Sequence, residues 1–152
     1  MRACRVAALA VLLICAGPVV ADGNGPGVNY MLHCQGCHLP GGIGHAGIVP
    51  NMRGEIGRFL EVQGGREFLI GVPGSAQSPL SDGALAEVLN WMVRAFGPAP
   101  AAAGFRPYSA AEVGLHRTPL TDVAAVRARL IERITARRGL TASAAAGPKG
   151  SR

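Results

Sequence analysis

The segment CQGCH carries two thiols, on Cys34 and Cys37, followed directly by the imidazole of His38. Thiols separated by two residues could form a redox-active disulfide, hold a metal ion or anchor a group through covalent bonds. The adjacent imidazole adds a nitrogen that can bind iron or zinc. The chemistry of this chain is therefore expected in this segment.

The order Cys-x-x-Cys-His is the pattern at which c-type haem is attached to protein. The two thiols add across the haem vinyl groups, and the spacing lets both reach one macrocycle, while the next residue falls under the iron as its proximal ligand. We therefore predict one covalent haem c, with its iron, bound by Cys34, Cys37 and His38.

Three other readings of the same segment are weaker. A thioredoxin-like redox pair needs a preceding strand, and no strand pattern precedes Cys34. A zinc site needs a second ligand pair, whereas His33, His45 and His116 are scattered. A disulfide between Cys34 and Cys37 would close too short a loop to stabilise the fold and would leave His38 without a role.

The first 21 residues resemble a secretory signal peptide, with a basic start, an apolar run over residues 6–14 and small residues before residue 22. The apolar run is too short for a membrane span of roughly 20 residues. Cys15 would be a lipidation site, but the bulky Ile14 before it argues against this. We expect cleavage and a mature protein in the periplasm, where Cys34 and Cys37 are its only thiols.

The formal net charge of +6 is concentrated at one end of the chain. Residues 24–97 hold four arginines and five carboxylates, whereas residues 106–152 hold nine basic and three acidic side chains. A basic segment of this kind is usually solvated, or else it contacts an acidic partner or an anionic membrane surface. Nucleic acid is a poor partner for an exported haem protein.

The pattern of apolar residues favours helices throughout, and strand signals are weak. We expect a helix ending near residue 32, a short helix over residues 66–70 and a clear helix over residues 82–96 with Asp82 as its N-cap. The recurring glycines of residues 40–57 exclude a stable helix there and favour a chain that wraps closely around something.

The C-terminal part is expected to hold two further helices. Ser109 and Glu112 have the spacing of a capping box. A second helix should follow Thr121, with one apolar side and arginines over much of the rest. The apolar side comprises Val123, Val126, Leu130 and Ile134, and the arginines are Arg127, Arg129, Arg133, Arg137 and Arg138.

From Val28 to Phe96 the chain resembles the class I, mitochondrial-type cytochromes c. Tyr30 stands four residues before Cys34, where the family places an aromatic residue that meets the last helix of the domain. The segment PNMRG, beginning at Pro50, is similar to the family's Pro-Asn-Leu-x-Gly. The resemblance implies that the Pro50 carbonyl accepts the second N–H of the proximal histidine, which would orient His38.

The resemblance fails at the sixth iron ligand. Family members take a methionine from the loop before the last helix, and here residues 72–80 hold neither methionine nor histidine. The alternatives are an open position, a weak oxygen ligand from Gln77 or Ser75, or one of four residues elsewhere: Met31, Met52, Met92 and His116. Each of the three methionines is more simply a packing residue.

We expect an all-α protein: a class I cytochrome c-like haem domain with a helical basic C-terminal extension. The expected parts are a signal peptide (1–21), the haem domain (22–97), a linker (98–108), the helical extension (109–138) and a disordered tail (139–152).

The leading functional hypothesis is a periplasmic single-electron carrier or electron-transfer subunit, not an enzyme, whose partners are redox proteins such as a dehydrogenase or an oxidase. Two alternatives remain. One is a five-coordinate haem protein that binds small gases or peroxide, as a sensor or a peroxidase-like protein. The other is a binding module in which the haem is structural and the basic tail makes the contact.

Overall fold

The computed structural model describes residues 23–98 and 104–145, and every regular element within them is a helix. This confirms the expected all-α class. The expected signal peptide and the residues 99–103 and 146–152 lie outside the described residues. The elements in chain order are α1 (Pro26–His33), α2 (Gln35–His38), η1 (Pro40–Gly42), η2 (Ile56–Glu61), α3 (Gly65–Gly71), α4 (Pro73–Ala76), α5 (Asp82–Phe96), α7 (Ala110–His116) and α8 (Val123–Ala145).

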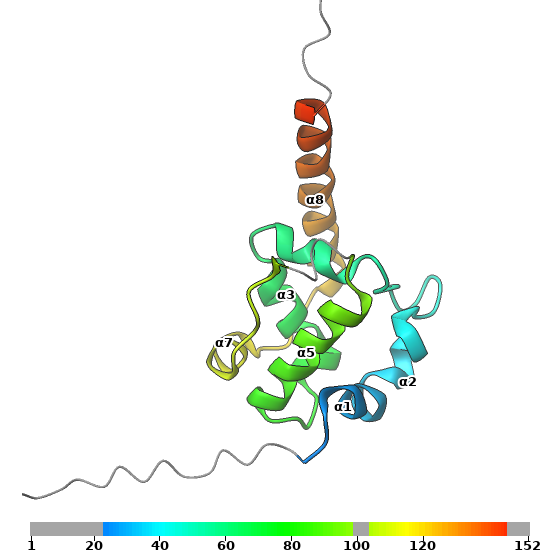
Figure 1. The fold of residues 1–152 in the computed structure, drawn as a ribbon, viewed down its shortest axis with the longest axis vertical. Helices are drawn as coiled ribbons and strands as arrows, with labels where there is room; N and C mark the ends of the chain where they lie inside the picture. The colour runs from blue at the N-terminus through cyan, green and yellow to red at the C-terminus, as the bar shows by residue number, and fades with distance from the viewer. Residues whose placement is uncertain (1–22, 99–103, 146–152) are drawn as a thin grey trace, which may run out of the picture.

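Helix α5 is the centre of the core, with α1 crossing one end of it and α7 packed against it (Figure 1). Leu85, Val88 and Leu89 are almost fully buried because the apolar residues recur at three- and four-residue steps. The N-cap is Ser81, not Asp82 as expected: its hydroxyl accepts from the Ala84 N–H at 3.2 Å.

An aromatic cluster joins α1 to α5. The Tyr30 ring lies 5.2 Å from Trp91 and 5.3 Å from Phe96, between ring centroids. The Tyr30 hydroxyl donates to the Leu39 carbonyl at 2.7 Å, so the ring also ties α1 to the chain that follows the two cysteines. The packing of Tyr30 against Trp91 and Phe96 of α5 is the contact that the family resemblance implied.

The glycine-rich segment between η1 and η2 turns sharply because several glycines have positive φ. Gly44, with φ 63°, is the tightest case: a Cβ there would collide with the backbone carbonyls of Val49 and Pro50. Its N–H donates to the His38 carbonyl at 3.0 Å. Apart from the single turn of η1 and the first residues of η2, residues 40–57 are non-helical as expected, and Gly44 binds the last residue of α2.

The C-terminal extension, α7 and α8, is fastened to the rest of the molecule. Tyr108, expected in a linker, is buried, and its backbone N–H donates to the Asn90 side chain at 2.7 Å. Ser109 caps α7 as expected, accepting from the Glu112 N–H at 3.2 Å. The Glu112 carboxylate does not reciprocate, since it binds Arg66 and Arg106.

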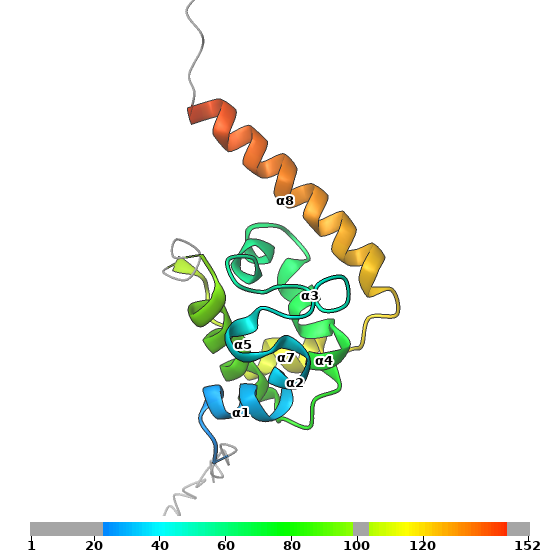
Figure 2. The same ribbon diagram turned by 90° about the vertical axis from the view of Figure 1, so that its right-hand side faces the viewer.

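Helix α8 lies against η2 and α3, and its C-terminal end projects beyond the other helices (Figures 1 and 2). Leu130 and Ile134 are buried in this contact. The helix runs to Ala145, so the end expected at residue 138 is wrong, and Gly139 does not interrupt it. Over the described residues, no helix is both long and apolar enough to span a membrane.

Candidate functional site

Short helices bring the two thiols and the imidazole to one side of the chain. Helix α1 ends at His33, and α2 begins immediately after Cys34. Within α2 the His38 N–H donates to the Cys34 carbonyl at 3.0 Å. Because residues three and four apart share a helix face, Cys34, Cys37 and His38 face the same space.

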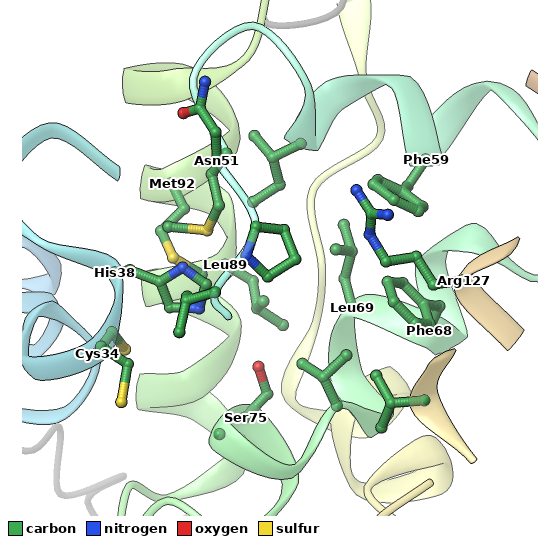
Figure 3. A pocket seen from close by; sticks show the side chains of 18 of the residues that line it. Cys34, His38, Asn51, Phe59, Phe68, Leu69, Ser75, Leu89, Met92 and Arg127 are labelled. Carbon is green, nitrogen blue, oxygen red and sulfur yellow. The ribbon is translucent and has the colours of Figure 1, made fainter. Parts of the chain in front are cut away.

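That space is a cavity of about 320 Å³ whose walls are mostly apolar. In Figure 3, His38 and Leu69 lie on opposite sides of it. The lining combines residues from α1, α2, the glycine-rich segment, η2, α3, α4, α5 and α8, whereas η1 and α7 contribute none. The polar or sulfur-bearing lining residues are His33, Cys34, Cys37, His38, Asn51, Met52, Ser75, Met92 and Arg127.

The imidazole of His38 is set up as a neutral ligand. Burial lowers the pKa of His38, and the Pro50 carbonyl opposes this as a hydrogen-bond acceptor. Nδ1 of His38 is nevertheless buried without a partner of standard hydrogen-bond geometry. The Pro50 carbonyl is therefore close enough to influence the ring but does not form a well-aligned hydrogen bond in this conformation.

The two thiols are free and differ in burial: Cys34 is half-buried and Cys37 is exposed. Burial, with a smaller contribution from Cys37, raises the pKa of Cys34 to about 11. Thioredoxin-like pairs have a lowered thiol pKa instead, so the environment disfavours that alternative. For zinc, no group of three or more His, Cys, Asp or Glu side chains able to hold a metal ion exists in residues 23–98 and 104–145.

The residues present fit a haem c. The cavity offers apolar walls for a macrocycle, two free thiols at one edge and a buried imidazole nitrogen that has no protein partner. An unpartnered buried nitrogen is costly unless another group satisfies the ring. Fixing the imidazole on iron through one nitrogen would turn Nδ1 toward an acceptor such as the Pro50 carbonyl.

The structure separates the candidates for the sixth ligand. Met52, Met92 and Ser75 line the cavity. Gln77 and His116 do not, and Met31 is 53% exposed, so the expectation that Met31 packs in the core is wrong. Among the histidines outside the motif, only His33 reaches the cavity, where it is an exposed residue at the rim beside Cys34.

One arginine of the extension lines the cavity and a second binds the segment that follows α4, and neither was singled out by the sequence. Arg127 was expected on the polar side of its helix, but it is half-buried and lines the cavity. Arg117 donates to the carbonyls of Ala76, Ser78 and Leu80, the segment in which the family carries its methionine. Arg127 follows Val123 by four residues and precedes Leu130 by three, and this spacing could have predicted that it lies on the inner side of the helix. No sequence pattern indicated a role for Arg117.

Comparison with known proteins gives a consistent result. Two proteins named cytochrome c-552, both from Thermus thermophilus, are similar to this chain. One is 32% identical over 123 residues, covering 69% of this chain and 82% of the relative. The other is 33% identical over 105 residues, covering 57% of this chain and 80% of the relative. No family model matches the chain.

Proposed function

The chain belongs to the cytochrome c family, and on that premise we propose that it is a periplasmic single-electron carrier with one haem c held by Cys34, Cys37 and His38. Family membership makes it an electron-transfer protein rather than an enzyme. The observation that carries the assignment of residues is the apolar cavity into which both free thiols and the half-buried His38 ring face.

Each of the three residues has a distinct role in this proposal. The thiols of Cys34 and Cys37 each add across one vinyl group, so that sulfur bonds to one carbon and the thiol hydrogen moves to the other. The His38 imidazole binds the metal from one side. When bound, haem c supplies an iron that alternates between Fe(III) and Fe(II), and the protein need make or break no bond during turnover.

The surroundings of His38 tune the reduction potential. The Pro50 carbonyl favours a ring that carries a proton on the nitrogen away from the metal, which strengthens the imidazole as a ligand. The apolar walls, including Ile56, Phe68 and Leu69, would keep water away from the metal. Such burial favours the less charged Fe(II) state and raises the potential.

Electron exchange would occur where the cavity opens to solvent, near the exposed Cys37. Exposed apolar side chains precede and follow the motif in the chain, and of these Ile48 lines the cavity. They are Val28, Met31, Leu32, Ile43 and Ile48. A small apolar surface suits brief contact with a redox partner, for which a periplasmic dehydrogenase or oxidase is the class we propose.

Mass spectrometry of protein made in a bacterial host that attaches haem c tests the assignment. The exported product should lack the leader and carry the mass of one haem. Replacing Cys34 and Cys37 together by Ser should abolish the added mass, and H38A should retain it while losing the low-spin spectrum. The matched control is H45A, which changes an exposed histidine outside the cavity. Colourless protein without added mass from the wild-type gene would refute the proposal.

A second function, binding of a small gas or peroxide at the iron, is favoured by one observation. The wall facing His38 is formed by α3 and α4, where Leu69, Val72 and Ser75 line the cavity and offer no sulfur or imidazole. Adding carbon monoxide to the reduced protein tests this. A spectrum that shifts within seconds supports an open or weakly held position, whereas an unchanged spectrum excludes this function.

A further inference from the structure

Arg127 lies on the inner face of α8. It follows Val123 by four residues and precedes Leu130 by three, and these residues with Ile134 form one stripe along the helix. The other three members of the stripe are apolar, and Leu130 and Ile134 are buried against the rest of the molecule. Arg127 is therefore the one charged member of a stripe whose other residues are apolar and face the rest of the molecule.

Among the described residues, the Arg127 guanidinium has no counter-charge. In residues 23–98 and 104–141, no hydrogen bond or ion pair involves its side chain. Its neighbours on α8 differ: Arg133 donates to the Gln63 carbonyl at 3.2 Å, and Arg138 lies 3.6 Å from the Glu61 carboxylate. A half-buried cation without a partner is unfavourable unless an anion meets it.

The direction of the side chain shows where that anion would be. Figure 3 shows Arg127 extending between Phe59 and Phe68, on the side of the cavity away from Cys34. It carries the only guanidinium among the described residues that line the cavity. In haem, the vinyl groups lie toward one edge of the macrocycle and the two propionates toward the opposite edge. A macrocycle attached at Cys34 and Cys37 therefore directs its carboxylates away from the cysteines.

We propose that Arg127 binds a haem propionate, so that α8 closes the acidic edge of the cofactor site. This inference rests on the proposed function. A guanidinium matches a carboxylate in charge and in hydrogen-bond geometry. The pair offsets one negative charge near the metal, and it therefore disfavours Fe(III) and raises the reduction potential. It also gives the basic extension a role inside the haem site, beyond any contact with a partner.

The test compares Arg127→Gln with Arg129→Gln in the purified holoprotein. Both changes remove one positive charge from α8, but Arg129 is exposed. In resonance Raman spectra, R127Q should shift the propionate bending band, and its midpoint potential should fall. R129Q should leave the band in place and move the potential much less. Arg127→Lys keeps the charge and should restore most of the potential but not the band.

The outcomes separate this inference from the proposed function. If R127Q carries haem and matches R129Q in both the propionate band and the potential, the inference is overturned while the haem assignment stands. If the wild-type protein carries no haem, the proposed function fails before Arg127 is tested. Circular dichroism of R127Q and R127K verifies that the helices are retained, and R127K alone carries the test if R127Q does not fold.

Discussion

Arg66 on α3 and Glu112 on α7 form a two-point ion pair, with Nε–Oε1 at 2.7 Å and Nη2–Oε2 at 2.8 Å. The guanidinium also lies 4.0 Å above the Tyr108 ring, and Arg106 donates to the same carboxylate. Side-chain exposure is 17% for Arg66 and 14% for Glu112. This cluster fastens α7 and the residues before it to α3.

The cluster should make stability depend on acid pH. Hydrogen bonding from Arg66 lowers the pKa of Glu112 from 4.5 to about 2. A lowered folded-state pKa contributes stability above pH 4.5 that is lost as the pH falls toward 2. Glu112→Gln should therefore cost about 2 kcal/mol of unfolding free energy at pH 7, and the difference from wild type should shrink between pH 4.5 and 2.

Urea unfolding across this pH range measures the effect. The control is Glu132→Gln, which changes an exposed carboxylate on α8. A deficit in E112Q that stays constant down to pH 2 would show that the charge of Glu112 is not its cause.

Packing of α8 is tested by a pair of leucines on the same helix. Leu130 is buried, and its Cδ2 would lie 3.7 Å from a Cβ at Gly64, whereas Leu140 is 73% exposed. Leu130→Ala should lower the unfolding free energy by about 2–3 kcal/mol, and Leu140→Ala should change it by less than about 0.5 kcal/mol. Equal, small effects of both changes would mean that α8 does not dock in solution.

Gly44 should be intolerant of a side chain. Its positive φ and the adjacent carbonyls of Val49 and Pro50 leave no room for a Cβ. Gly44→Ala should destabilise the protein by roughly 2–4 kcal/mol. Because the Pro50 carbonyl would be displaced from His38, the haem absorption bands should shift as well. Gly139→Ala, in an exposed turn of α8, should instead stabilise by up to about 1 kcal/mol.

The two methionines of the cavity should act as packing residues. Met92 is buried on the inner stripe of α5, and Met52 follows Pro50 on the segment that contacts His38, so neither belongs to the opposite wall. Met52→Leu and Met92→Leu should each retain the wild-type absorption spectrum in both oxidation states. Loss of a sulfur-to-iron charge-transfer band in one variant would identify that methionine as the ligand instead.

Local patterns predicted much of this fold. The apolar spacing of residues 82–96 matches α5, and the breakers around residues 66–70 match α3, because short-range periodicity and glycine or proline signals act within a few residues. The motif from Cys34 to His38 indicated the proposed haem site for the same reason: its chemistry lies in adjacent residues.

Features that depend on distant contacts were not predictable in this way. Arg127 was placed on the polar side because arginine is usually solvated, and only the packing of α8 over the cavity turns it inward. Tyr108 was expected in a linker because its partners, Arg66 and Asn90, come from helices distant in the sequence. Met31 precedes the motif closely, yet its position on α1 faces solvent.

Arg117 has a consequence for the speed of electron exchange. Its guanidinium, 15% exposed, also binds the Asp82 carboxylate at 2.9 Å, so one side chain joins several carbonyls of residues 76–80 to the start of α5. Backbone secured at so many points can shift little when the charge on a nearby metal changes. We therefore expect a low reorganisation energy for a haem bound in the cavity, which would favour rapid electron transfer even when donor and acceptor differ little in driving force.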